Sequence, residues 1–384
     1  MGEPDPLGLT PSAWEAFAAA ADLPRYRGRQ IFDAIHRRGR RDFAAMTELP
    51  GGLRERLAIE MPIRLPEIAR RDEAGDGSVK FGLRLSDGAL IEAVYMPGST
   101  AFAQVNEFTD ARAVASTRPS TLGARNSTPP TEKFTVCLSS QTGCAVDCAF
   151  CVTGRLGAGR NLSAGEILGQ LYAVLDATGR TAEGLRIVFM GMGEPFLNPE
   201  GVLPALEILF EILPPRRVTV STSGITSAFA SFAALPRRPN LAVSLNAADE
   251  ATRTRLMPIT RTYPIPDLVR AMRAWPLEPR RRILVEYVLI AGVNDREEDA
   301  LRLTRLLFGL EVKVNVIPLN EDPTYLPGWK RPDEPAIERF VKTIADARVT
   351  VTVRRSKGPD ASAACGQLKG RTEDPRKRSD SSRQ

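Results

Sequence analysis

Residues 134–151 read FTVCLSSQTGCAVDCAFC, and this stretch decides the fold. Its first five residues form an apolar, partly β-branched run, which predicts a buried strand. A loop follows that contains glycine and polar residues and carries Cys144, Cys148 and Cys151. Five more short runs of this kind follow along the chain and alternate with helical patterns, so the strand at 134–138 is the first of a series.

The series of runs predicts an α/β fold with a parallel sheet. Several runs are apolar throughout, which is typical of parallel strands that are covered on both faces. The sequence Ser-Ala-Gly-Glu at 163–166 is a capping box, and it predicts that a helix follows the first strand. Six βα units indicate a partial (βα)6 barrel with its active site at the carboxyl ends of the strands. The predicted strands cover 134–138, 186–190, 217–221, 241–245, 282–290 and 312–318.

Composition excludes several classes of protein. The chain has 384 residues, of which 43% are hydrophobic and 26% charged, with a net charge of +6, so it is neither fibrous nor mostly disordered. It has neither the apolar run of ~18 residues that a membrane span needs nor a signal-peptide pattern, so we expect a cytoplasmic protein without membrane contact. Five cysteines are too few for a disulfide framework, and a single histidine, His36, excludes a site of several histidines.

The organisation along the chain predicts five segments. The first has helical patterns at 11–21, 26–37 and 53–59. The third is rich in Gly, Ser, Thr, Pro and Asn, which is typical of a flexible surface insertion. The predicted segments are an N-terminal helical basic module (1–64), a β-hairpin and linker (65–97), a flexible insertion (98–133), a barrel domain (134–368) and a disordered tail (369–384).

The basic excess is concentrated in the N-terminal module. Between Arg25 and Arg41 there are seven arginines and one acid, Asp33. Apolar residues fall on one face of the predicted helix and leave the arginines on the others. Such a face is often simply solvated, but clustered phosphates are the natural partner of many guanidinium groups. We therefore interpret the module as RNA-binding.

The three cysteines have the spacing C-x3-C-x2-C. Three thiolates at this spacing can hold three irons of a [4Fe–4S] cluster and leave the fourth iron open for a substrate. The alternative is a structural zinc ion, which needs four ligands, and the one nearby candidate for a fourth ligand is Cys137 on the preceding strand. The spacing favours the cluster.

These cysteines, with Phe150 before the last of them, resemble the signature of the radical S-adenosylmethionine (SAM) superfamily. The surrounding sequence resembles, more narrowly, the family of dual-specificity RNA methyltransferases that includes RlmN and Cfr. The resemblance extends from Leu23 to Leu368 and is broken chiefly by the 98–133 insertion. Five separated segments carry it in the same order: 23–32, 91–95, 136–151, 191–195 and 363–368.

The resemblance implies that SAM chelates the open iron through its amino and carboxylate groups. The Gly-Glu-Pro sequence at 193–195 would contact the methionine part of SAM. Where the family has Ser-Leu-His, this chain has Ser-Leu-Asn at 244–246, and asparagine can form hydrogen bonds but cannot become charged. The residues implied to bind SAM are Gly193, Glu194, Ser221, Ser244, Leu245, Asn246 and Asn320.

The resemblance also assigns roles to three further residues. Cys365 would be methylated by a first SAM, and a 5′-deoxyadenosyl radical from a second SAM would take hydrogen from that methyl group. The resulting methylene radical would add to an adenine ring carbon. Cys137 would then attack the sulfur of Cys365, forming a disulfide and releasing the product, and Glu92 would accept the proton lost from the ring.

The function implied by the resemblance is methylation of C2 of adenosine 2503 in 23S rRNA, with adenosine 37 of tRNA as a second substrate. We expect a monomer that takes electrons from a donor such as flavodoxin. A Cfr-type reaction at C8 of the same adenosine would use the same cysteines, although the N-terminal module favours C2. An alternative from another class is a non-catalytic RNA-binding protein whose cysteines hold zinc.

Overall fold

A computed structural model describes residues 5–98, 132–354 and 368. A ten-stranded sheet forms its centre, and its strands lie side by side in sequence order. Neighbours are antiparallel from β1 to β4 and parallel from β4 to β10. The strands are β1 (Glu67–Glu73), β2 (Val79–Arg84), β3 (Leu90–Met96), β4 (Phe134–Cys137), β5 (Leu185–Phe189), β6 (Val218–Thr222), β7 (Asn240–Ser244), β8 (Ile283–Leu289), β9 (Val312–Pro318) and β10 (Val351–Val353).

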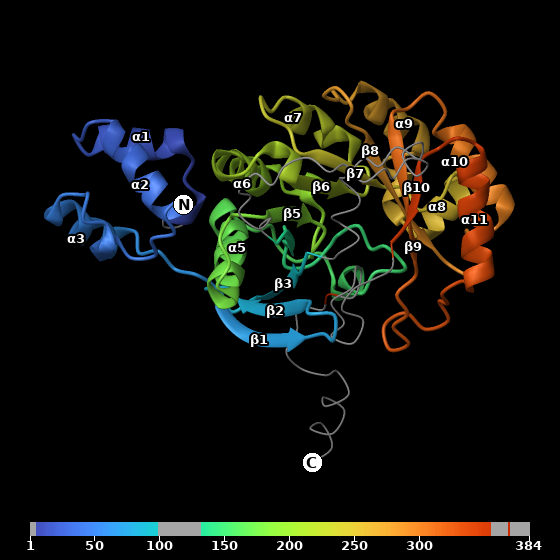
Figure 1. Cartoon of the computed structure of the whole chain (residues 1–384), viewed down its shortest axis with the longest axis horizontal. Coiled ribbons are helices and arrows are strands. Elements are labelled where there is room, and N and C mark those ends of the chain that lie inside the picture. Colours follow the sequence, from blue (N-terminus) through green and yellow to red (C-terminus); the bar gives the residue numbers. More distant parts are fainter. Residues whose placement is uncertain (1–4, 99–131, 355–367, 369–384) are drawn as a thin grey trace, which may run out of the picture.

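Helices connect the parallel strands and lie around the outside of the curved sheet (Figure 1). Ser163 caps the first of them, as predicted, because its side chain accepts a hydrogen bond from the backbone N–H of Glu166. The core forms where the apolar stripes of these helices meet the strands, and Val136, Ile187 and Ile167 are fully buried in it. The helices are α5 (Ala164–Thr178), α6 (Pro199–Ile212), α7 (Phe229–Ala233), α8 (Glu250–Leu256), α9 (Ile265–Ala274), α10 (Glu297–Leu306) and α11 (Glu334–Asp346).

Three N-terminal helices form a separate group beside α5 and α6: α1 (Pro11–Ala20), α2 (Tyr26–His36) and α3 (Gly51–Glu60) (Figure 1). The first two pack closely because Gly28 has no side chain, and a Cβ there would lie 2.3 Å from the carbonyl oxygen of Trp14. The group is attached to α5 through His36, whose Nδ1 lies 2.6 Å from the hydroxyl of Tyr172. Burial lowers the pKa of His36 to about 3, so its ring is neutral in the folded protein.

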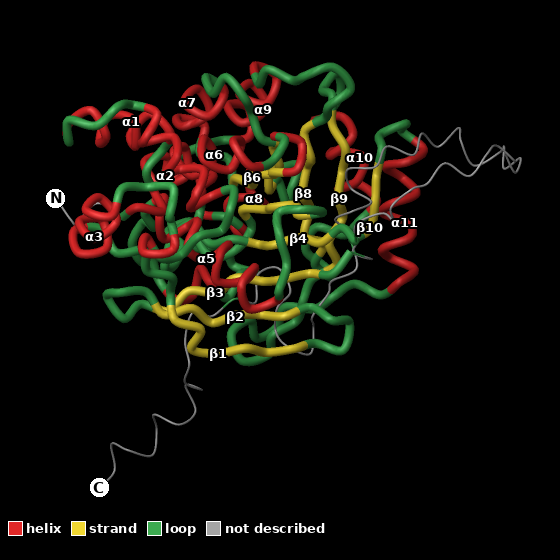
Figure 2. Tube along the Cα trace, turned by 60° about the vertical axis from the view of Figure 1, so that its left-hand side comes forward, coloured by secondary structure: helices red, strands yellow, loops and turns green. Residues whose placement is uncertain are grey.

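The predicted fold class is confirmed, since the parallel strands and their helices form an open, partial barrel (Figure 2). The predicted strand at 312–318 coincides with β9, and the other five predicted strands overlap β4 to β8. Local sequence patterns do not predict β1 and β10. The first is largely polar and pairs only with β2 at the edge of the sheet, and the second has three residues, too few to show a pattern.

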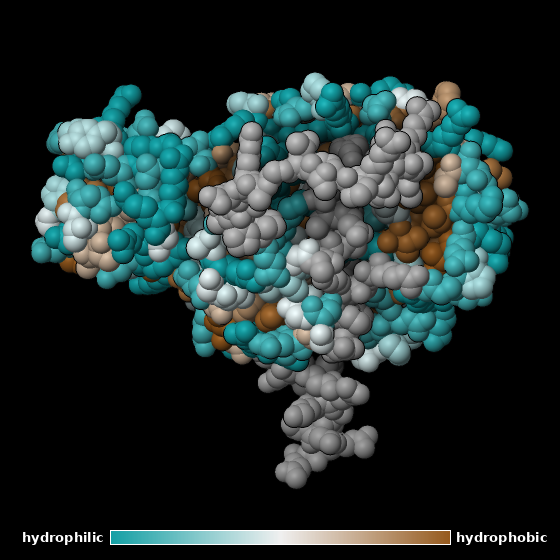
Figure 3. Space-filling view, in the orientation of Figure 1, coloured by the Kyte–Doolittle hydropathy of each residue, from teal (hydrophilic) through white to brown (hydrophobic). Residues whose placement is uncertain are grey.

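Some predicted segments fall largely outside the described residues. Of the predicted insertion, residues 99–131 lie there, and so does the predicted tail at 369–384. None of the described helices is long and apolar enough to cross a membrane. Where grey atoms do not cover it, the face of the molecule in Figure 3 is mostly hydrophilic, and its clearest hydrophobic area lies on the right-hand side.

Candidate active site

The carboxyl ends of strands β4 to β9 surround one cavity. Each of these strands, or the loop that follows it, contributes at least one lining residue. Parallel strands end at the same edge of their sheet, so residues far apart in the sequence meet there. The cavity brings together nine of the predicted site residues: Cys144, Cys148, Cys151, Gly193, Glu194, Ser221, Ser244, Asn246 and Asn320.

Backbone hydrogen bonds shape the loop after β4 that holds the three cysteines. Cys144 donates its N–H to the carbonyl of Gly157 at 2.8 Å, and Cys151 donates to the carbonyl of Cys148 at 3.0 Å. Gly143 is required at its position, because a Cβ there would lie 2.2 Å from the carbonyl oxygen of Gly157. The loop therefore holds three thiols along one wall of the cavity.

The chemistry of this wall fits an iron–sulfur cluster. The three cysteines are free thiols, and burial raises the pKa of Cys144 to about 12 and that of Cys148 well above its ordinary value. Cluster irons bind thiolates, so loading must displace these protons. No group of three or more His, Cys, Asp or Glu among the described residues is arranged to hold a single metal ion. In a [4Fe–4S] cluster each thiolate binds a different iron, so the three sulfur atoms lie around the cluster and need not converge on one metal ion.

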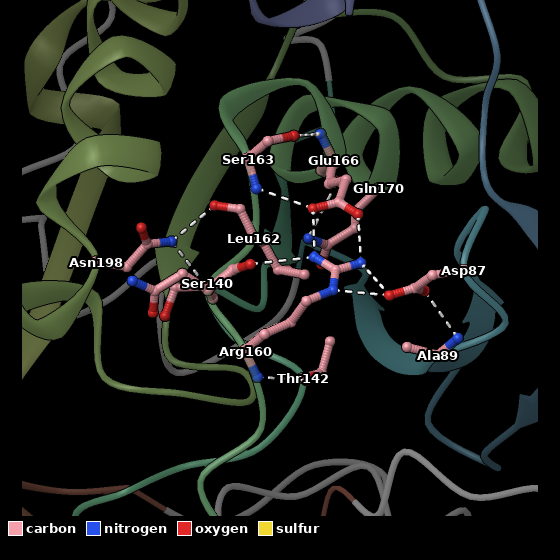
Figure 4. A network of polar contacts seen from close by, with 11 residues as sticks. Asp87, Ala89, Ser140, Thr142, Arg160, Leu162, Ser163, Glu166, Gln170 and Asn198 are labelled. Carbon is pink, nitrogen blue, oxygen red and sulfur yellow. Dashed lines mark hydrogen bonds and ion pairs between the residues drawn. The ribbon is translucent and has the colours of Figure 1, made fainter. Parts of the chain in front are cut away.

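A polar network fixes the loop at its far end (Figure 4). Arg160 Nη2 lies 2.7 Å from Asp87 Oδ2, in the turn between β2 and β3, and 2.7 Å from Glu166 Oε1, in the first turn of α5. The hydrogen bond from Arg160 holds the pKa of Asp87 below its ordinary value. Asn198 donates its amide to the carbonyl of Ser140 at 2.9 Å, before the cysteines. The hairpin, the cysteine loop and α5 are thereby locked together.

Glu194 is the carboxylate that follows β5, and the backbone around it fixes its orientation. Its two oxygens accept hydrogen bonds from the N–H groups of Phe196 at 2.9 Å and Ser223 at 2.6 Å. Burial raises its pKa. Gly193 has a φ of 95°, and a Cβ there would lie 2.5 Å from the Cβ of Gln141, so only glycine fits. A fixed carboxylate at the cavity wall suits an ammonium group.

The predicted residues at 244–246 play different parts. Ser244 lines the cavity, whereas the side chain of Leu245 is buried and does not. Asn246 lines the cavity, but its Oδ1 accepts from the N–H of Val288 at 2.8 Å and its Nδ2 lies 3.1 Å from the sulfur of Met257. Asparagine at the position of the family histidine therefore joins the end of β7 to β8.

Arg253 on α8 is a functional residue that the sequence does not predict; it is fully buried and bonds the backbone of residues that line the cavity. Its guanidinium donates to the carbonyl of Leu245 at 3.1 Å, the hydroxyl of Thr260 at 2.8 Å and the carbonyl of Ser223 at 2.7 Å. Burial lowers its pKa to about 10, so it remains charged at neutral pH. One arginine in a short helix gives no sequence signal for this role.

Glu286 of β8 is a second unpredicted residue of the site, a buried carboxylate that lines the cavity. It stands between Ser244 of β7 and Asn315 of β9 in the sheet register. Asn315 donates its amide to Glu286 Oε1 at 3.3 Å, and burial raises the pKa of the carboxylate. An acid inside the otherwise apolar run 283–289 is the signal that could have found it.

Cys137 and Glu92 lie on neighbouring strands beside the cavity and do not line it. Cys137 of β4 pairs with Val94 of β3, so Glu92, two residues before Val94, lies on the same face of the sheet. Glu92 is buried, and its Oε1 lies 3.5 Å from the ammonium group of Lys80.

Cys365 lies outside the described residues. Leu368 lines the cavity, and its carbonyl accepts a hydrogen bond from the hydroxyl of Thr153 at 2.8 Å.

Most of the arginines between 25 and 41 already have partners within the protein. Arg29 and Arg37 lie 2.7 and 3.2 Å from Glu211 Oε2, on α6. Burial alone would raise the pKa of Glu211, but hydrogen bonds from arginines, Arg29 among them, hold it below its ordinary value. Arg41 reaches Asp176 of α5 at 3.5 Å, whereas Arg27 and Arg38 form their side-chain hydrogen bonds within the module. Five of the seven arginines therefore have a side-chain partner within the protein.

Comparisons with known proteins agree with this arrangement. The model of the radical SAM superfamily matches residues 138–304, and that of the ribosomal RNA large subunit methyltransferase N-terminal domain matches residues 5–63. A probable dual-specificity RNA methyltransferase RlmN from Koribacter versatilis is 41% identical over 91% of this chain and 97% of its own. The RlmN of Anaeromyxobacter dehalogenans is 38% identical over 98% of this chain and 95% of its own.

A solved structure supports the same family. The crystal structure of a radical SAM methyltransferase from Sphaerobacter thermophilus has a TM-score of 0.79 and 39% sequence identity, and the match covers 95% of this chain and 99% of that one. The radical SAM family uses a [4Fe–4S] cluster and SAM, which confirms the cluster that the cysteine spacing favours and the SAM that the resemblance implies. The chain belongs to the RlmN family of dual-specificity RNA methyltransferases and is a radical SAM enzyme.

Proposed function

We propose that the enzyme methylates C2 of adenosine 2503 in 23S rRNA and that adenosine 37 of tRNA is its second substrate. One observation carries the proposal: the three cysteines and six of the seven residues expected to bind SAM line one cavity. Similarity to relatives named RlmN and to the rRNA methyltransferase N-terminal domain supports C2 over the Cfr-type C8 reaction. These RNAs place the enzyme in the cytoplasm, where we expect a monomer and a flavodoxin-like electron donor.

The residues of the cavity have distinct roles in this proposal. Cys144, Cys148 and Cys151 hold the cluster, and Glu194 binds the amino group of SAM. Serine and asparagine side chains at the strand ends orient the rest of SAM by hydrogen bonds. When bound, the cluster and SAM supply the radical that removes hydrogen from a methyl group, because adenine C2 is electrophilic and resists ordinary methyl transfer.

Cys365, Cys137 and Glu92 complete the reaction at the side of the cavity. Leu368, which follows the expected methyl acceptor Cys365 by three positions in the sequence, lines the cavity and supports this proposal. Once the Cys365 methylene is bonded to adenine, the radical adduct must lose one electron and the C2 proton: Glu92 accepts the proton, and the oxidised cluster, when bound, would accept the electron. The Cys137 thiolate then attacks the Cys365 sulfur, which forms the disulfide and breaks the sulfur–methylene bond. The electron pair of that bond stays with the former methylene carbon, which takes a proton and becomes the methyl group.

Mass spectrometry of nucleosides from cells with and without the gene tests this proposal. We expect 2-methyladenosine to disappear from rRNA and tRNA when the gene is deleted. Loss of 8-methyladenosine instead would identify the Cfr-type reaction. Unchanged nucleosides, together with a colourless purified protein that contains zinc, would favour the non-catalytic RNA-binding alternative.

A further inference from the structure

The amino ends of the barrel strands carry a second polar surface, on the edge opposite to the active site. A groove of about 480 Å³ lies there, formed by residues at the beginnings of β4 to β8. Its charged lining residues are all cationic, and none of its lining residues is acidic. We call this the basic groove, and its cationic residues are Lys133, Arg186, Arg216, Arg217, Arg280 and Arg281.

Three arginines of the basic groove keep their charge uncompensated. Arg216, Arg217 and Arg280 form no ion pair and no side-chain hydrogen bond with any residue that the structure describes. Nearby acids already have partners, since Glu278 lies 2.9 Å from Arg281 and Glu132 pairs with an arginine outside the groove. Three unpaired guanidinium groups around one hollow attract anions and repel other cations.

We propose that the basic groove binds phosphate groups of the RNA backbone, an inference that rests on the proposed function. The planar guanidinium group forms paired hydrogen bonds with phosphate, and five of the six cations are arginines. The groove has no aromatic residue on which a base could stack, so the contact is with the backbone and does not read sequence. Pro279 and Gly184 are its only uncharged lining residues besides Asn240, so it lacks the apolar centre of a protein interface.

The position of the groove determines which RNA it can bind. Arg217 lines the groove and Ser221, four residues further along β6, lines the active-site cavity, so the buried strand separates the two by about 13 Å and they open at opposite edges of the sheet. The RNA segment in the groove is therefore not the one that contains the target adenosine. Only a large folded RNA can reach both edges at once, so the groove adds affinity for folded rRNA and none for a short hairpin with the target adenosine.

Charge reversal in the groove tests the proposal against a matched control. The groove variant combines R216E, R217E and R280E. The control variant combines R273E, R305E and R339E, which lie exposed on α9, α10 and α11 and change the net charge equally. Binding of a folded fragment of 23S rRNA and of a short hairpin is measured across a series of salt concentrations. Unfolding midpoints of both variants establish that they fold, and alanine replaces glutamate where a midpoint falls.

We expect the groove variant to bind the folded fragment at least about tenfold more weakly, with the slope of log K against log salt reduced in magnitude by about two to three. The control should keep the slope of the unmodified chain, and the hairpin should bind all three proteins equally. An unchanged salt slope for the groove variant, or an equal loss of RNA affinity in the control variant, would refute the proposal that the basic groove binds RNA phosphates. If the unmodified chain bound neither RNA, the proposed function itself would fail.

Discussion

The two ends of the barrel strands hold their polar side chains in opposite ways. At the carboxyl ends, Glu194, Asn246 and Arg253 are buried, and each forms several hydrogen bonds within the protein. At the amino ends, Arg216 and Arg280 are exposed and unpaired among the described residues. Catalysis needs groups that are fixed before the reaction starts, whereas binding a polyanion needs charges that are free to pair with phosphates. The carboxyl edge of the sheet therefore holds fixed groups for catalysis, and its amino edge holds solvated cations that are free to bind RNA.

The largest effect should come from the cysteine loop at the rigid edge. Replacing Cys144, Cys148 and Cys151 with alanine should remove the brown colour of the protein and lower SAM cleavage by at least about 1000-fold, since a group that the chemistry requires is lost. Absorbance and product analysis under reducing, oxygen-free conditions measure both. C137A is the matched control, because it removes a cysteine outside the cavity and should keep the colour. SAM cleavage by the triple variant would refute the cluster assignment.

The second largest effect should be the difference between the C137A and C365A variants in forming an adduct with RNA. C365A should lack the methyl acceptor and form no adduct with RNA. C137A should still accept the methyl group and react with adenine, then stop, because no other thiolate outside the cluster loop remains to attack the adduct. It should purify with RNA that nuclease trims and denaturant does not remove. An adduct in C365A, or in neither variant, would contradict the assigned roles.

The sequence was sufficient to predict the strands and their common edge because both depend on local patterns. Runs such as 312–318 are apolar and β-branched, and a parallel order fixes where their carboxyl ends meet. The edges of the sheet could not be predicted so well. β1 gains its strand conformation from pairing with β2 rather than from its own polar residues.

The site could be predicted where a residue stands in a motif or at a strand end. Arg253 shows the limit, because its role comes from burial under strand ends of β6 and β7, and a tertiary contact leaves no local pattern. The arginines of α2 show the converse. Their spacing indicates a solvated or RNA-binding face, yet Arg29 and Arg37 meet Glu211, which lies far away in sequence.

The third effect tests the rigidity of the catalytic edge. R253M should lower the free energy of unfolding by roughly 3 kcal/mol, because buried carbonyl groups of Leu245 and Ser223 lose their donor. The strand ends beside the cavity should also loosen, weakening SAM binding about tenfold. Chemical denaturation and calorimetry measure the two effects. R253K keeps the charge and should recover part of the stability. Unchanged SAM affinity in R253M would show that the edge is held by other contacts.

A smaller effect concerns His36, which is remote from both edges. Its pKa is about 3 in the folded protein and near its ordinary value of 6.5 in the unfolded chain, so the unfolded chain takes up the proton first. The stability due to the neutral ring is complete above pH 6.5 and decreases as the pH falls from there toward 3, by at most about 1.4 kcal/mol per unit. H36Q should show a shallower decrease between pH 6.5 and 5 in urea unfolding. Identical pH dependence of the two proteins would refute this account.

The smallest effect separates the two sets of arginines. R29A/R37A removes two partly exposed ion pairs with Glu211, which together stabilise the protein by about 1 kcal/mol. The salt dependence of RNA binding should hardly change, because these guanidinium groups already have a carboxylate partner and are not free to neutralise phosphates. Arg25 and Arg40 have no ion pair within the described residues, so R25A/R40A is the matched control that should flatten the salt slope by about one to two. A larger slope change in R29A/R37A would mean that RNA displaces Glu211 from its arginines, and the contrast between paired and unpaired cations would no longer indicate where RNA binds.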